Sequence, residues 1–79
     1  MRIVVKLFGS LPERVSGYDR VNGLPLDVPE GSTVRDVIAG LGLSDADWGV
    51  ATCGGRILDG DSMLSAGAVF SVLQSAHGG

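Results

Sequence analysis

The sequence has little of what metal-binding and nucleic-acid-binding sites are made of. It contains one cysteine, Cys53, and one histidine, His77, so it can form no disulfide within the chain and cannot supply a Cys/His set for zinc. Six Lys and Arg residues stand against nine Asp and Glu residues, and only 5% of the residues are aromatic. We therefore predict no metal site, no basic patch for phosphates and no platform for stacked bases, and hence no nucleic-acid partner.

Long hydrophobic runs are also missing. The apolar run at the start, Ile3-Val4-Val5, is far too short for a signal peptide or a membrane span, so we expect a cytoplasmic protein with no membrane contact. A hydrophobic content of 44% with 19% charged residues is typical of a compact globule rather than a disordered chain. The length of 79 residues suits a single domain over residues 1–79.

What the sequence does have is one well-marked helix. Thr33 followed by Asp36 is a capping box with a shorter acid than usual, and it predicts that the helix begins after Thr33. The apolar residues that follow have helical spacing and form one stripe: Val34, Val37, Ile38 and Leu41. Gly42 suits the left-handed position after the helix, and Leu43 suits the apolar contact of a Schellman cap.

Five other segments are predicted strands, residues 2–8, 24–28, 48–53, 56–58 and 68–73. In the first, Ile3, Val5 and Leu7 should face the core, which leaves Phe8 on the opposite face. Pro25 predicts an edge position for the second strand, and Gly54-Gly55 predicts a type I′ hairpin. Residues 9–23 are expected to be a loop, and Met63 and Leu64 to return to the core.

The predicted order is therefore β-β-α-β-β-β, an α+β domain. A single helix can cover only one face of a sheet. Further apolar side chains must then lie on the open face, and an open apolar face often marks a partner surface.

The sequence ends in Gly78-Gly79. A segment without Cβ atoms can extend into a channel too narrow for other residues, and its carbonyl carbon is unhindered. A partner could therefore activate this carboxylate, for example as an acyl-adenylate. The alternative is a frayed end without function. His77 is expected to be a solvated tail residue, and Cys53 a small apolar residue rather than a nucleophile.

Three stretches and their order resemble the MoaD/ThiS sulfur-carrier family: residues 4–9 with Leu11 and Glu13, residues 31–34, and residues 64–69 before the diglycine. The resemblance implies the ubiquitin-like β-grasp, a mixed sheet of four to five strands on one helix, with a flexible, protruding tail over residues 73–79. Two features depart from the family pattern, Gly54-Gly55 in place of Asn-Gly and Ala66-Gly67-Ala68 in place of an acidic turn. The long segment 9–23 points toward the molybdopterin branch.

The function implied by this resemblance is that of a carrier, not an enzyme. An E1-like adenylating enzyme would use ATP and magnesium to activate the carboxylate of Gly79, and a sulfur donor would convert it to a thiocarboxylate. An acceptor such as a molybdopterin synthase large subunit would then take the sulfur. Among the pathways of the family, the resemblance favours molybdenum or tungsten cofactor biosynthesis. Gly78 would give the tail reach, and Phe8, Ile57 and Leu73 would dock the partner. No cofactor of its own is implied.

Alternatives remain open at this point. Phe8, Ile57 and Leu73 could be ordinary core residues. Activated Gly79 could instead form an isopeptide bond with a target lysine, as in a ubiquitin-like modifier; Lys6 is the only lysine available for self-linked chains. The chain could also be a plain β-grasp interaction module whose tail has no role.

Overall fold

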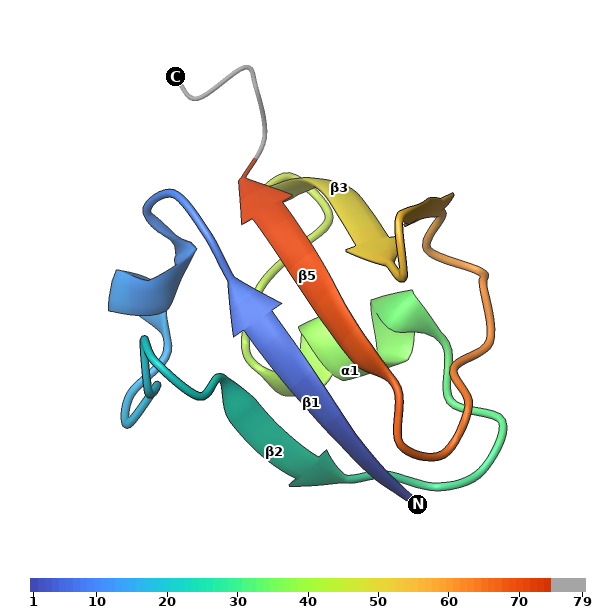
Figure 1. Cartoon of the computed structure of the whole chain (residues 1–79). Coiled ribbons are helices and arrows are strands. Elements are labelled where there is room, and N and C mark those ends of the chain that lie inside the picture. The colour runs from blue at the N-terminus through green and yellow to red at the C-terminus, as the bar shows by residue number, and fades with distance from the viewer. Residues whose placement is uncertain (75–79) are drawn as a thin grey trace.

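The computed structural model describes residues 1–74 (Figure 1). Along the chain the elements are β1 (Arg2–Leu7), a 3₁₀ helix (Leu11–Arg14), β2 (Leu24–Asp27), α1 (Val34–Gly40), β3 (Trp48–Cys53), β4 (Arg56–Leu58) and β5 (Val69–Gln74). Within the described residues the strands form one five-stranded sheet in the order β2-β1-β5-β3-β4. The predicted α+β class and order of elements are confirmed.

β5 is the central strand of this sheet. It pairs with β1 in parallel and with β3 antiparallel, while the outer pairs β1/β2 and β3/β4 are antiparallel, so the sheet is mixed. β2 lies at one edge, as Pro25 predicted, because proline has no N–H to donate to a further strand. Gly54 and Gly55 connect β3 to β4 with positive φ angles of 58° and 82°, as a type I′ turn requires.

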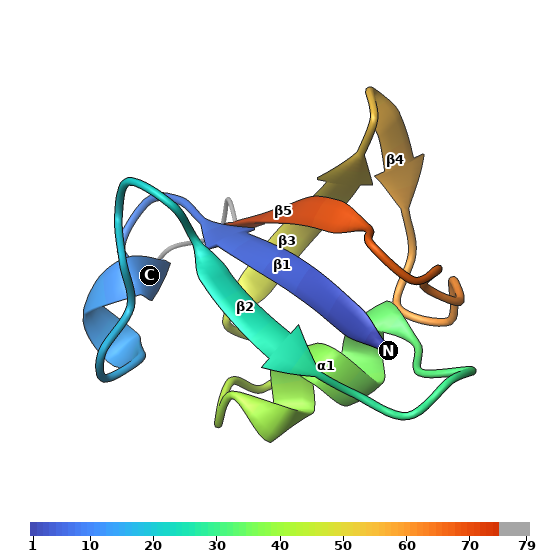
Figure 2. The ribbon, with the colours of Figure 1, turned by 60° about the horizontal axis from the view of Figure 1, so that its bottom comes forward.

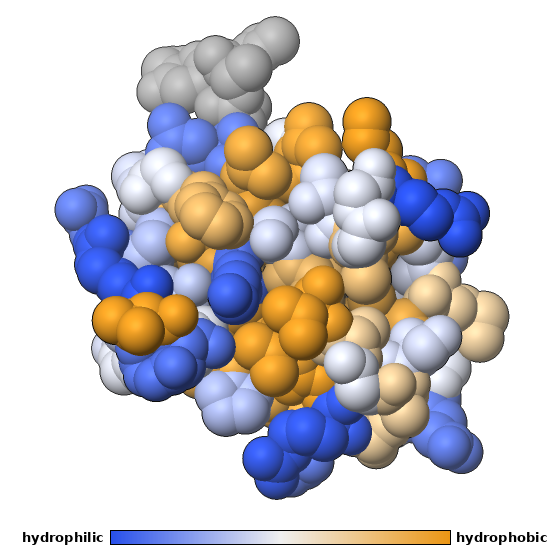
Figure 3. Space-filling view, viewed as in Figure 1, coloured by the Kyte–Doolittle hydropathy of each residue, from blue (hydrophilic) through white to orange (hydrophobic). Residues whose placement is uncertain are grey.

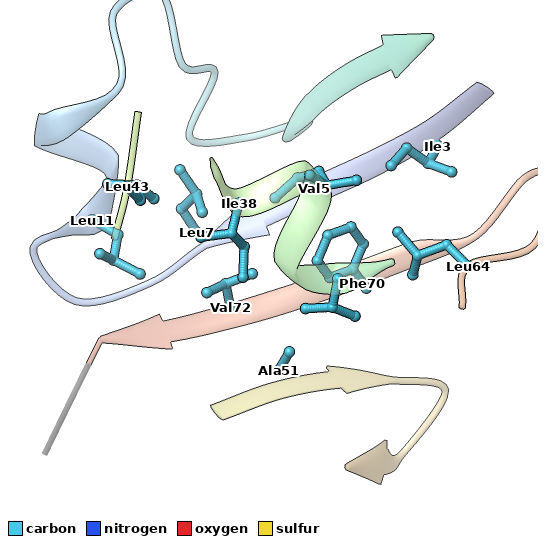
Figure 4. Packing of buried hydrophobic residues seen from close by; sticks show 12 residues of the cluster. Ile3, Val5, Leu7, Leu11, Ile38, Leu43, Ala51, Leu64, Phe70 and Val72 are labelled. Carbon is cyan, nitrogen blue, oxygen red and sulfur yellow. The ribbon is translucent and has the colours of Figure 1, made fainter. Parts of the chain in front are cut away.

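α1 covers one face of the sheet (Figure 2). Alternate residues of β1 and β5 point toward it, and Ile3, Val5 and Phe70 are fully buried there. From the apolar stripe of the helix, Ile38 points into this layer (Figure 4), and Val34 is buried in the same cluster. The predicted core face of β1 is confirmed, and the core lies on this side of the sheet, where α1 and the connecting segments with Leu11, Leu43 and Leu64 cover it.

Both predicted ends of α1 are present. The hydroxyl of Thr33 accepts the N–H of Asp36 at 3.2 Å, and the Asp36 carboxylate accepts the N–H of Thr33 at 3.1 Å. At the other end, the N–H of Leu43 donates to the carbonyl of Ile38, and that of Gly42 to Ala39, which is the Schellman pattern. These caps fix where the helix begins and ends, and Leu43 is buried beneath the second one.

Three expectations need correction. Residues 9–23 are not only loop: they contain the 3₁₀ helix, and Leu11 at its start is buried because it packs into the core. Met63 is 69% exposed, whereas its neighbour Leu64 is buried, because Met63 forms an extended bridge with Thr33 and successive extended residues point to opposite sides. The tail does not begin at residue 73, since Leu73 and Gln74 pair with β3 as part of β5.

No helix in residues 1–74 combines the length and the apolar character needed to cross a membrane.

Candidate docking face

The face of the sheet that α1 leaves uncovered carries an apolar row at the end of β5. Leu73 of β5 lies opposite Val50 of β3, and Phe8 follows β1 on the other side, where its N–H donates to the carbonyl of Val72 at 3.0 Å. All three side chains are exposed, by 41–49%. We call Phe8, Leu73 and Val50 the exit row, because the chain leaves the sheet just after it.

Two further rows cross the same face. The middle row contains Lys6, Ser71, Thr52 and Ile57, which the strand registers place side by side. The third row pairs Val4 with Val69. Figure 3 shows apolar side chains spread over this face, interrupted by polar ones. Exposed apolar side chains that gather on one face of a domain often mark a surface that binds other proteins.

The predicted docking residues therefore share one face of the sheet. Phe8, Ile57 and Leu73 all lie on the uncovered face and are exposed, which rules out the alternative that they are core residues. Whether a partner binds there stays a prediction. Val69 and Val50 belong to the same surface and were missed. Val69 shares the alternation of Leu73 and could have been found from it.

Val50 could not be found by counting alternate residues, because a bulge interrupts β3. Gln74 pairs with Trp48, but the next residue back, Leu73, pairs with Val50, so β3 contains one extra residue here. The bulge lets Trp48 pack against the core while Val50 points to the uncovered face. Trp48 is partly buried.

Several carboxylates form hydrogen bonds or ion pairs away from the middle of this face. Hydrogen bonds from Thr33, first of all its backbone N–H, hold the pKa of Asp36 below its ordinary value, and the backbone N–H of Ser44 does the same for the pKa of Asp47. At the edge, Asp27 binds Arg2 at 2.9 Å, and that hydrogen bond lowers the pKa of Asp27. The middle of the uncovered face therefore keeps Lys6 as its charged group, in a chain with net charge −3.

The end of β5 is held from both sides. Gln74 pairs with Trp48 of β3, and its side-chain oxygen Oε1 accepts hydrogen bonds from the N–H and the hydroxyl of Ser10, at 2.5 and 2.6 Å. Gly78, Gly79 and His77, the other residues to which a role or an alternative was attached, lie outside the described residues.

Cys53 is a partly buried free thiol that packs against the core, as a small apolar residue does. Within residues 1–74, no group of three or more His, Cys, Asp and Glu residues is placed to hold a metal ion.

Comparisons with known proteins rest on structure alone. Neither the protein-family models nor the curated proteins include a match to this sequence. Among solved structures, the chain is similar to a Pyrococcus furiosus protein assigned as molybdopterin converting factor, subunit 1, with a TM-score of 0.70 and 21% identity over 96% of this chain and 99% of that one. The chain has the ubiquitin-like β-grasp fold.

Two archaeal structures have the same β-grasp architecture. SAMP1 from Haloferax volcanii matches with a TM-score of 0.68 and 18% identity, and each chain is covered in full. A structure of H. volcanii small archaeal modifier protein 1 matches with a TM-score of 0.67 and 19% identity over 95% of this chain and 98% of that one.

Proposed function

We propose that this β-grasp protein is a sulfur carrier whose C-terminal Gly79 carries the sulfur as a thiocarboxylate. The observation that carries the proposal is the position of the exit row. An exposed apolar surface lies directly beside the end of β5, and the chain continues from there to Gly78-Gly79. A partner bound to the exit row would have the end of the chain within reach of its own active site.

The chemistry would take place on the partners. An E1-like enzyme would transfer AMP from ATP, with magnesium, to the carboxylate of Gly79 and release pyrophosphate. The resulting acyl-adenylate has a good leaving group, so a sulfur donor can displace AMP and leave a thiocarboxylate. The acceptor enzyme would then take the sulfur for its own substrate, and water would supply the oxygen that regenerates the carboxylate of Gly79. In this cycle the protein is a carrier and substrate, not an enzyme, and it needs no cofactor of its own.

The acceptor that we favour is a molybdopterin synthase large subunit. The support is the likeness to the P. furiosus protein assigned as molybdopterin converting factor, subunit 1. A second support is the length of the segment over residues 9–23, which resembles that branch of the family. Thiamine synthesis and tRNA thiolation use the same carrier chemistry and would be distinguished by the acceptor.

A second candidate function is supported by the likeness to small archaeal modifier protein 1. Activated Gly79 would then form an isopeptide bond with a lysine of a target protein. The only lysine of this chain, Lys6, lies in the middle row of the uncovered face. Self-linked chains would have to pass through a residue that a docked partner covers, so we expect single attachments rather than chains.

Intact mass spectrometry tests the proposal. The chain is incubated with an E1-like enzyme, ATP, magnesium and a sulfur donor, and we expect a mass gain that matches one oxygen-to-sulfur exchange. The matched control lacks Gly79 and should gain nothing. Covalent adducts of higher mass that need Gly79 would favour the modifier. No change with several activating enzymes would overturn both functions and leave a plain interaction module.

A further inference from the structure

At the end of β5, a side chain makes the contact with the β1 side that the main chain no longer makes. Leu7 is the last residue of β1 in register with β5, opposite Val72, and the N–H of Phe8 makes the final main-chain bond between the two strands. Beyond this point β1 turns away at Gly9. Gln74 is therefore paired by its backbone only on the β3 side, with Trp48.

The side chain of Gln74 supplies the missing contact on the β1 side. Its Oε1 accepts two hydrogen bonds from Ser10, the residue that precedes the 3₁₀ helix. Together with the pairing to Trp48, this ties the end of β5 to both of its neighbours. Ser10 and Gln74 are both exposed, so the contact contributes little burial. What it restricts is the direction of the backbone at Gln74.

Gly9 makes room for this contact. A Cβ on Gly9 would lie 2.5 Å from Oε1 of Gln74 and 2.8 Å from its Cγ, which is far closer than real Cβ atoms approach. Gly9 also has a φ of 69°, in the left-handed region that glycine adopts without strain. Two independent features of the Gly9-Ser10 turn, its conformation and its lack of a side chain, therefore accommodate the Gln74 side chain.

We propose that Gln74 is a positioning residue: its bond to Ser10 fixes the direction in which the chain leaves the sheet beside the exit row. This inference deepens the proposed function and rests on it for its consequence. A partner docked on Phe8 and Leu73 would then meet a strand end whose backbone is already fixed at Gln74. Without the bond, the partner would have to order the backbone at Gln74 on binding, which weakens binding without changing the chemistry at Gly79.

The test compares two variants of similar side-chain length. Gln74→Glu keeps an oxygen that can accept both bonds from Ser10, whereas Gln74→Met keeps the length and loses the acceptor. The first readout is the ¹H–¹⁵N heteronuclear NOE of the backbone amides of residues 73–75 in the isolated full chain. We expect the NOE at 74 and 75 to fall in Gln74→Met and to stay at the wild-type level in Gln74→Glu, with thermal stability nearly equal in all three.

The second readout is adenylation by an E1-like enzyme. We expect the KM for Gln74→Met to rise about fivefold or more, as for ordering one additional residue, with kcat unchanged and with the wild-type KM restored in Gln74→Glu. An unchanged NOE in Gln74→Met would overturn the proposal, whatever the kinetics. A lowered NOE with an unchanged KM would reduce the bond to a local structural contact and overturn the positioning role. If the wild-type chain is not adenylated at all, the proposed function fails, while the NOE comparison still decides whether the bond directs the chain.

Discussion

The two faces of the sheet are built from similar apolar residues but have different surroundings. On β1, Ile3 and Val5 lie under α1 with no exposed surface, while Phe8, which follows the same strand, is half exposed on the other face. β5 repeats the pattern, with Phe70 buried and Val69 and Leu73 exposed. The covered face supplies the burial that stabilises the domain. The uncovered face has apolar groups that the fold does not require, and these remain available to a partner.

Phe70 and Phe8 allow the most direct test of this comparison, because the residue type is the same on both faces. Phe70→Ala removes a fully buried ring and should lower the free energy of unfolding by about 3–5 kcal/mol. A small domain has only about 5–15 kcal/mol in total, so we expect extensive unfolding at 37 °C. Urea or thermal unfolding followed by circular dichroism measures the effect. A loss below about 1 kcal/mol would contradict the assignment of the core face.

The helix that covers the core, α1, can be destabilised at its N-terminus. Thr33→Ala removes the hydroxyl that accepts the N–H of Asp36, and it should cost about 1 kcal/mol of stability. Thr33→Ser keeps the hydroxyl and serves as the control. Because Thr33 lies away from the uncovered face, adenylation of the folded variant should keep its wild-type KM. A raised KM would contradict the view that the covered face stabilises the fold and the uncovered face binds the partner.

Phe8→Ala should show the opposite profile. Half of this ring is exposed, so its truncation should lower the free energy of unfolding by less than about 1 kcal/mol. If Phe8 is a docking residue, the KM for the activating enzyme should rise by about tenfold or more, as for interface residues whose truncation matters. Stability from chemical denaturation and KM from adenylation are measured on the same preparation. A large loss of stability with a normal KM would show that Phe8 stabilises the fold and would contradict its role in docking.

β4 offers a smaller version of the same test. Ile57 is 79% exposed, so Ile57→Ser should change stability by no more than about 0.5 kcal/mol. Its neighbour Leu58 packs against the core and provides the matched control, because Leu58→Ser should cost clearly more. Parallel thermal unfolding of the two variants decides whether alternation holds as far as this edge strand.

The smallest expected effect is a dependence on pH that comes from the helix side of the molecule. The pKa of Asp36 is lower in the folded chain than its ordinary value of 3.8, chiefly because of the backbone N–H of Thr33. Because the pKa is lower in the folded state, the ionised carboxylate stabilises the fold at pH values above the ordinary pKa. This stabilisation is lost as the pH falls through the pKa of the folded state. Asp36→Asn should therefore flatten the acid limb of a plot of melting temperature against pH, and an unchanged limb would contradict the assignment.

The features that the sequence predicted are those set by neighbouring residues. Thr33 with Asp36, Gly42 with Leu43, and the Gly54-Gly55 pair each define a local geometry through their own hydrogen bonds or φ angles, and each is present. The alternation of β1 likewise placed Phe8 on the open face.

The features that the sequence did not predict depend on distant partners. The bulge that turns Val50 outward exists because β3 must pair with β5, and no short pattern in β3 signals it. Met63 turns outward because it bridges Thr33. The bond from Gln74 to Ser10 joins residues far apart in the sequence, so neither residue by itself indicates it. The candidate site was thus found in outline, but the contacts that shape its end were not.

The parallel pairing of β1 with β5 has a consequence for how the molecule is made. Val4 pairs with Val69, which lies far away in the sequence. The central strand of the sheet, β5, is also the last described strand along the chain. Contacts so distant in sequence fold slowly, because the intervening chain must be closed before they contribute. During synthesis, the pairs β1/β2 and β3/β4 would lack the strand that joins them until β5 emerges from the ribosome. The complete sheet and the exit row should therefore form together, late in synthesis, when β5 pairs with β1 and β3.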